Sequence, residues 1–98
     1  MKRIRGNMTN YQKGASFERR VVKWYQEQGF ASCRSAGSHG KSDVWAYHKG
    51  QMIFNSLRIH NIWSPLEREE FESYCKAHSA IGRFVWRDKG NKICFKEL

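Results

Sequence analysis

The chain has 98 residues, with 18 Lys and Arg against nine Asp and Glu, and its formal net charge is +9. This length supports one domain whose modest core buries about 60 to 65% of the surface, which excludes a second compact unit. Residues 1–41 contain nine basic and two acidic residues, a difference of +7, and a phosphate polymer is the natural partner of such a segment. A membrane surface is disfavoured because the sequence shows no basic amphipathic helix with a wide apolar face.

The cysteines and the N-terminus indicate the compartment. Cys33, Cys75 and Cys94 are odd in number and form no C-x-x-C pair, a pattern that favours neither a disulfide framework nor a four-ligand zinc site. Cys75 and His78 could share a metal, but without a second pair we interpret them as ordinary helix residues. The first residues have the charge of a signal peptide without its apolar centre, and no apolar run approaches about 18 residues. We expect a cytoplasmic protein, in the host cytoplasm if the source is viral, that is neither exported nor membrane-spanning.

The N-terminal third is predicted to be a basic, flexible arm over residues 1–13 followed by a helix over residues 15–28. The arm offers four cations to phosphates, namely Lys2, Arg3, Arg5 and Lys13. Apolar side chains then recur at helical spacing on one arc, and Gly29 supplies the stop. The members of this arc are Phe17, Val21, Val22, Trp24 and Tyr25.

Glu18 lies inside the apolar arc of this predicted helix. A carboxylate among Val21, Val22 and Tyr25 is costly to bury unless a cation or hydrogen-bond donors meet it. The alternative is a position at the rim of the core, where the carboxylate reaches water.

The remaining residues predict three strands, a helix and two strands. A short strand over residues 30–34 ends in the polar loop SAGSHGKS, and strands over 43–48 and 51–60 are joined by a tight turn at Lys49 and Gly50. A helix follows over 64–78, and two strands at 81–88 and 92–98 flank a turn. The predicted fold is therefore a single α/β domain over residues 1–98, a central mixed sheet flanked by helices in the order αβββαββ.

The second helix opens with Ser64, Pro65 and Glu67, a serine cap, a proline at the first position and a glutamate that returns the cap's bond. The acidic residues in its first turns suit the helix dipole, so we interpret them as a solvated helix start and not as a metal site. Apolar side chains near this helix either form a strip for a twofold contact or pack on the sheet. They are Trp63, Leu66, Phe71 and Tyr74.

Several motifs in this order and spacing resemble one family. K-G-x-x-F-E-R begins at residue 13, G-F at residue 29, R-S-A-G-S at residue 34 and S-D-V at residue 42. Together they resemble the archaeal-type Holliday junction resolvases, with their viral and phage relatives, in the PD-(D/E)XK nuclease superfamily. The resemblance is close over residues 11–58 and extends to the rest only in element order. It implies a restriction-endonuclease-like core and a metal-dependent endonuclease that acts as a homodimer on four-way DNA junctions.

The resemblance also implies roles for particular residues. Glu18 and Asp43 match the family's metal-binding acids, for which Mg²⁺, with Mn²⁺ as a substitute, is the expected ion. The family's loop that approaches the scissile strand is matched by Arg34, Ser35 and Ser38, which would hold phosphate through charged and hydroxyl hydrogen bonds. We add further DNA contacts at the arm and around these motifs. The complete expected set is Lys2, Arg3, Arg5, Lys13, Arg19, Arg34, Ser35, Ser38, His39 and Lys41.

The next strand departs from the family pattern. The family places an acid or glutamine, any residue and then a lysine on this strand, and here Ser56, Leu57 and Arg58 occupy those positions. Ser56 and Arg58 share one face of the strand. A serine is a neutral, weak metal ligand, and an arginine can fork onto phosphate but does not accept a proton at neutral pH. We assign Glu18, Asp43, Ser56 and Arg58 to the catalytic site, with the first three as metal ligands.

Three functions remain open at this point. The protein cuts branched DNA, with water activated by the metal and Arg58 stabilising the transition state. Alternatively, it has lost turnover and binds junctions without cutting them. A third possibility is a small RNA-binding or protein-binding module that stacks bases on aromatic rings. The candidate rings for that module are Trp45, Tyr47, Trp63 and Trp86. His39 is a possible catalytic histidine, although a solvated loop histidine is the commoner case.

Overall fold

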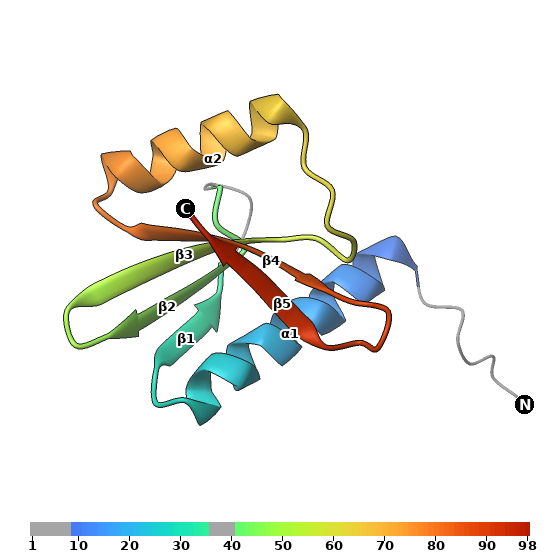
Figure 1. Ribbon diagram of the computed structural model, residues 1–98. Coiled ribbons are helices and arrows are strands. Elements are labelled where there is room, and N and C mark those ends of the chain that lie inside the picture. The colour runs from blue at the N-terminus through green and yellow to red at the C-terminus, as the bar shows by residue number, and fades with distance from the viewer. Residues whose placement is uncertain (1–8, 36–40) are drawn as a thin grey trace, which may run out of the picture.

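The computed structural model describes residues 9–35 and 41–98, which form two helices and five strands in the predicted order αβββαββ. The elements are α1 (Asn10–Glu27), β1 (Ala31–Arg34), β2 (Val44–His48), β3 (Gln51–Leu57), α2 (Pro65–Ala77), β4 (Ile81–Arg87) and β5 (Ile93–Glu97). The strands form one five-stranded sheet in the order β1-β2-β3-β4-β5. Neighbouring strands are antiparallel except β3 and β4, which are parallel and joined through α2, so the predicted mixed sheet is confirmed (Figure 1).

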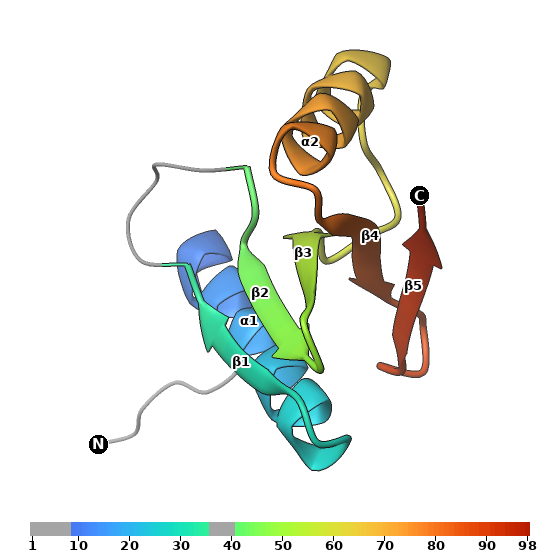
Figure 2. The same ribbon diagram turned by 90° about the vertical axis from the view of Figure 1, so that its left-hand side faces the viewer.

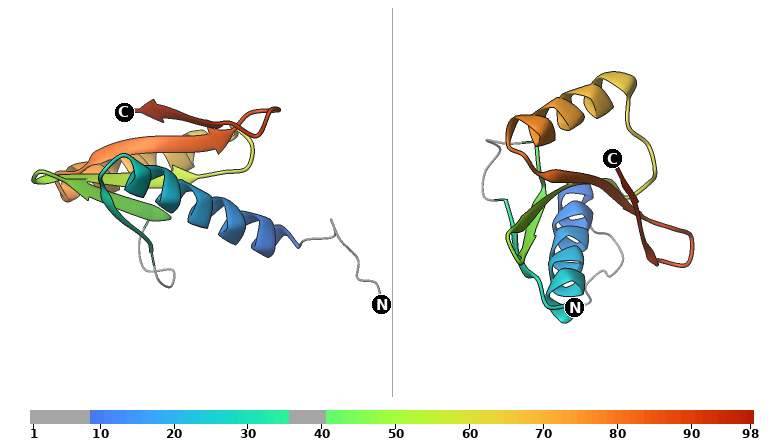
Figure 3. Two further views of the ribbon diagram at one scale, coloured as in Figure 1. Left: turned by 90° about the horizontal axis from the view of Figure 1, so that it is seen from below. Right: turned by 60° about the vertical axis from the view of Figure 1, so that its left-hand side comes forward.

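The two helices lie on opposite faces of the sheet, as the views in Figures 2 and 3 show. α1 packs against β1 and β2, and α2 lies over β4. Each helix therefore closes its own core. The core under α1 contains Phe17, Val21, Tyr25, Val44, Ala46, Ile53, Leu57 and Val85. The core under α2 contains Trp63, Phe71, Cys75 and Phe84. Neither helix of the described chain is long and apolar enough to cross a membrane.

α1 begins at Asn10 and not at residue 15, because a capping box precedes the apolar arc. The Thr9 hydroxyl accepts a hydrogen bond from the Gln12 backbone N–H at 3.1 Å, and the Gln12 side chain accepts one from the Thr9 N–H at 2.9 Å. The prediction of a flexible arm is therefore wrong for residues 10–13, and Lys13 belongs to the helix. Residues 1–8 of that arm lie outside the described residues. The predicted stop is confirmed, since Gly29 has a φ of +92°.

α2 has the predicted capping box of Ser64 and Glu67, with Pro65 in the first turn. Trp63 and Phe71 are buried in the core, whereas Leu66 is 61% exposed. The packing alternative is therefore correct for Trp63 and Phe71, and neither ring contributes to an exposed strip. Burial of Trp63 also removes it from any surface for stacking bases.

The β2–β3 hairpin turns at Lys49 and Gly50, whose φ angles are +50° and +80°. Two consecutive residues with positive φ fit a tight hairpin turn, and such a turn fixes the register of the strands. Val44, the first residue of β2, pairs with Asn55, so Asp43, which precedes it, lies beside Ser56 near the end of β3. This register places alternate residues of β3 against opposite helices, with Asn55 toward α1 and Ser56 toward α2.

Candidate functional site

Asp43 is fixed between two strands at the end of the sheet. Its backbone N–H donates to the Asn55 carbonyl at 2.7 Å, and its own carbonyl accepts from the Ser35 N–H at 3.0 Å. The carboxylate is oriented as well, because Oδ2 accepts from the Leu57 backbone N–H at 2.8 Å. Burial raises the pKa of the Asp43 carboxyl, and the Glu18 carboxylate raises it further, while the Leu57 N–H and Arg58 oppose the rise. Asp43 is therefore a rigidly held acid whose negative charge is incompletely compensated.

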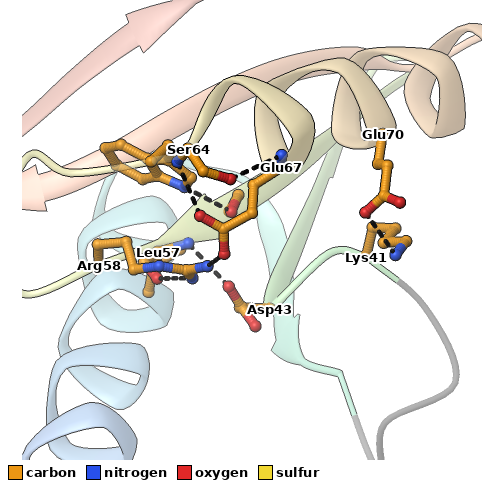
Figure 4. A network of polar contacts seen from close by, with 9 residues as sticks. Lys41, Asp43, Leu57, Arg58, Ser64, Glu67 and Glu70 are labelled. Atoms are coloured by element: carbon orange, nitrogen blue, oxygen red, sulfur yellow. Dashed lines mark hydrogen bonds and ion pairs between the residues drawn. The ribbon is translucent and has the colours of Figure 1, made fainter.

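Asp43 opens onto a pocket of about 250 Å³ between β3 and the start of α2 (Figure 4). Two of the predicted catalytic residues, Ser56 and Arg58, share this pocket with Asp43. The complete lining is Lys41, Asp43, Ser56, Arg58, Glu67, Glu70 and Phe71. Ser56 and Arg58, two residues apart, therefore face the same pocket, as alternate residues of a strand do.

Ser56 is buried, and its hydroxyl oxygen accepts a hydrogen bond from the Trp63 indole N–H at 3.0 Å. A neutral oxygen that already accepts one bond is a poor ligand for a hard divalent cation. Ser56 therefore links β3 to the segment that leads into α2. Its predicted role as a metal ligand receives no support from this geometry.

Arg58 is engaged by a residue of α2. Its Nη2 donates to Glu67 Oε2 at 2.6 Å, and its Nη1 donates to the Leu57 carbonyl at 2.9 Å. Glu67 also accepts from the Ser64 backbone N–H at 2.8 Å. That bond and the Arg58 guanidinium lower the pKa of Glu67, so the residue is a carboxylate at neutral pH. The free protein therefore holds Arg58 in an ion pair at the mouth of the pocket.

The sequence analysis did not assign Glu67 to the site, because its role in the capping box already accounted for a glutamate at this position. The capping box itself is the signal that could have found it. A glutamate at this position folds back toward the helix N-terminus, which here lies beside the end of β3. Glu70, one turn further along α2, accepts from Lys41 Nζ at 3.3 Å and faces the same pocket.

Glu18 lies on α1 with a quarter of its side chain exposed, and the cation that meets it is Arg34 of β1. Arg34 Nε donates to Glu18 Oε1 at 2.9 Å, and this bond raises the pKa of Arg34. Glu18 does not line the pocket of Asp43, although it is close enough to raise the pKa of Asp43. Glu18 therefore has both a protein counter-charge and an electrostatic link to Asp43.

The predicted DNA-binding residues divide into groups. Arg19 and Arg34 line a hollow of about 380 Å³ beside the first turns of α1, together with Tyr11, Gln12 and Ala15. Lys41 belongs to the pocket of Asp43, and Ser35 bonds the Asp43 backbone. The predictions for Lys2, Arg3, Arg5, Ser38 and His39 lie outside the described residues.

The donor set suits an oxygen-preferring cation only in part. No group of three or more His, Cys, Asp or Glu side chains that could hold a metal ion occurs within residues 9–35 and 41–98. Asp43 and Glu18 are two carboxylates whose mutual repulsion a divalent cation would relieve. Such a pair fits an ion that keeps several waters and shares its remaining positions with a phosphate, as Mg²⁺ does.

Comparison with known structures identifies the fold. The chain is similar to a Holliday junction resolvase, Hjc, from Archaeoglobus fulgidus, with a TM-score of 0.74 over 87% of this chain and 72% of that chain. The sequence identity is 20%, so the likeness shows the fold, which is restriction-endonuclease-like.

Sequence comparison identifies the family. A crossover junction endodeoxyribonuclease, Hjc, from Methanocaldococcus jannaschii is 46% identical over 43 residues, which are 44% of this chain and 32% of the relative. The match thus spans about a third of that relative's length. The family model for archaeal Holliday junction resolvase (Hjc) matches residues 9–79. The chain therefore belongs to the archaeal Holliday junction resolvase family, as its motifs predicted.

Proposed function

We propose that this protein is a structure-selective endonuclease that hydrolyses phosphodiester bonds at four-way DNA junctions. The observation that carries the proposal is the convergence of Asp43 and Arg58 on one pocket at the end of the sheet, in a member of the junction-resolvase family. A carboxylate and a guanidinium at one pocket provide an acid for a cation and a fork for a phosphate.

Asp43, which directly precedes β2, and Glu18 of α1 would hold the divalent ion, Mg²⁺ or Mn²⁺. When bound, that ion supplies a Lewis acid for the phosphoryl oxygen and lowers the pKa of a coordinated water. The Leu57 N–H keeps Asp43 Oδ2 in place, so Oδ1 is the oxygen that would bind the ion. Arg34 holds the Glu18 carboxylate and has further N–H groups for the neighbouring phosphate.

Arg58 binds the scissile phosphate and stabilises its developing charge. To do so its guanidinium exchanges the Glu67 carboxylate for phosphate oxygens, a substitution of one anion by another. An arginine side chain does not act as a base at neutral pH, so Arg58 takes no proton from the attacking water. Binding and catalysis are therefore both coupled to release of the Arg58–Glu67 pair.

A cleavage assay on a labelled four-way junction with Mg²⁺ or Mn²⁺ tests the proposal. Wild-type protein is expected to introduce metal-dependent, symmetric nicks, and Asp43→Asn is expected to abolish them. Glu27→Gln is the matched control, because Glu27 is an exposed carboxylate at the end of α1. Nicks that persist in Asp43→Asn would contradict the assigned site.

Junction binding without cleavage is the second candidate function, and Ser56 and Arg58 favour it. The restoring pair Ser56→Glu with Arg58→Lys separates the two. If wild type binds the junction without nicking it and the restored variant nicks, the protein is a binder that has lost turnover. Because Glu at position 56 must displace the Trp63 bond, the variant's thermal unfolding is measured alongside.

We also propose that the active form is a homodimer, since two symmetric cuts at a junction call for two sites related by a twofold axis. Ile62 and Leu66, 71% and 61% exposed beside the start of α2, support a contact there. Sedimentation of wild type and Leu66→Glu measures it. A monomeric wild type at the concentrations at which it nicks junctions would contradict the dimer.

A further inference from the structure

Two arginines on different elements, neither of them among the predicted DNA contacts, donate hydrogen bonds to the same neutral side chain beside α1. Arg20 Nη1 of α1 and Arg87 Nη1 at the end of β4 both donate to Asn91 Oδ1, at 3.0 and 3.1 Å. Arg20 also donates through Nη2 to the Asn91 backbone carbonyl. These hydrogen bonds join the turn between β4 and β5 to α1.

The charge of this cluster is not balanced. Neither Arg20 nor Arg87 forms an ion pair with any carboxylate in the described chain. The acid of the turn, Asp88, accepts the Lys92 backbone N–H at 2.8 Å through Oδ1. An asparagine oxygen orients two guanidinium groups but offsets neither charge, and like charges held close together repel.

An aspartate at position 91 would have made the same hydrogen bonds and neutralised part of this charge. Asn91 has a φ of +66°, a conformation that asparagine and aspartate both tolerate better than most residues. Backbone geometry alone therefore gives no reason for a neutral side chain here. An asparagine fixes the geometry of the arginines and leaves their charge available to an external anion.

The cluster lines a hollow of its own. Its volume is about 190 Å³, and it lies against the side of α1. The lining residues are Lys13, Ser16, Phe17, Arg20, Arg87 and Asn91. Lys13, Ser16 and Arg20 are spaced three and four residues apart, so they form one stripe along the helix. Arg19, on the neighbouring stripe, lines the separate hollow that also contains Arg34.

We propose that Arg20, Arg87 and Asn91, with Lys13, form a second phosphate-binding site that contacts the backbone of a duplex arm flanking the branch point. The inference rests on the proposed function, in which the substrate is DNA. The N-terminal half of α1 then lies between two cationic hollows, and a polymer of phosphates can occupy both. The contact is to the backbone and adds affinity and orientation without base specificity.

Asn91→Asp is the sharpest test, because it keeps the two hydrogen bonds and changes only the charge. A purely structural role predicts unchanged or higher thermal stability and unchanged DNA binding. A phosphate site predicts weaker binding of a short DNA duplex, with the slope of log K against log salt smaller in magnitude by about one to two. Arg20→Gln with Arg87→Gln should reduce the slope by about two, equivalent to about tenfold less salt-dependent loss between roughly 50 and 200 mM salt.

Gln51→Glu is the matched control, since it adds the same charge at the exposed start of β3. Its slope should equal that of wild type. Equal slopes for Asn91→Asp and Gln51→Glu would overturn the inference, even where the wild type cuts junctions. If wild type shows no junction preference but Asn91→Asp still lowers the duplex slope, the proposed function fails and the phosphate site stands. If Asn91→Asp does not fold, the paired arginine variant decides in the same assay.

Discussion

Replacing Tyr25 with phenylalanine removes one hydroxyl group from the interior of the protein. That hydroxyl donates to Asn55 Oδ1 at 2.6 Å and accepts from Arg83 Nη1 at 3.3 Å. Asn55 is 0% exposed, so water cannot replace the lost donor without opening the core. Leaving one buried acceptor unsatisfied costs about 1 to 3 kcal/mol. We therefore expect Tyr25→Phe to lower the free energy of unfolding by about 2 kcal/mol.

The loss is measured by urea unfolding followed by tryptophan fluorescence, and by thermal melting. For a domain of this size a loss of about 2 kcal/mol lowers Tm by about 8 to 16 °C. Tyr11→Phe is the control, because Tyr11 is 79% exposed and its hydroxyl is available to water. Junction cleavage by Tyr25→Phe should decrease as well, because the Asn55 backbone carbonyl accepts a hydrogen bond from the Asp43 N–H and so helps to position Asp43.

The double variant Tyr25→Phe with Asn55→Leu separates hydrogen bonding from packing. Removing both partners relieves the orphaned acceptor, so the double variant should lose less than the sum of the single losses. The reasoning is refuted if Tyr25→Phe is as stable as Tyr11→Phe, or if the double-variant losses simply add.

Three further outcomes are expected. Burial raises the pKa of Tyr25 above its ordinary value of 10.0. The hydroxyl therefore contributes fully to the free energy of unfolding below pH 10.0, and this contribution is lost as pH rises above 10.0. In Tyr25→Phe the free energy of unfolding should consequently depend less steeply on pH in the alkaline range. At Mg²⁺ tenfold above its dissociation constant, wild type should gain about 1.4 kcal/mol in urea unfolding, and equal gain by Asp43→Asn would exclude Asp43 as a ligand. Glu67→Gln should tighten junction binding because it frees Arg58 from its ion pair, whereas the control Glu69→Gln should leave binding unchanged. If Glu67→Gln still tightened binding in the Arg58→Gln background, Arg58 would not exchange Glu67 for a phosphate.

The fold was predictable because its signals are local. The turn at Lys49 and Gly50 and the capping box of Ser64 and Glu67 located the hairpin and the start of α2. The start of α1 was missed because the first 13 residues were interpreted from their four basic side chains as an arm, and the capping box of Thr9 and Gln12 was overlooked.

The family resemblance led us to expect Glu18 and Asp43 near one another, whereas it did not predict the partners that hold each carboxylate. Two environments were left open for Glu18, a buried acid met by a cation or a position at the rim, and the sequence did not reveal that Arg34, 16 residues away, meets its partly exposed carboxylate. The pairing of Arg58 with Glu67 and of Ser56 with Trp63 likewise depends on where α2 begins relative to β3. Such contacts follow from the packing of separate elements, which neither periodicity nor spacing specifies.

The two-residue turn at Lys49 and Gly50 constrains how this protein can change by insertion and deletion. Strand side chains alternate with a period of two, so gaining or losing one residue within β3 before Ser56 would turn Ser56 and Arg58 toward α1. Every functional side chain would still be encoded, yet the pocket would be dismantled. We therefore expect one-residue changes within the strand to be tolerated less well than insertions in the turn, which a longer loop can absorb.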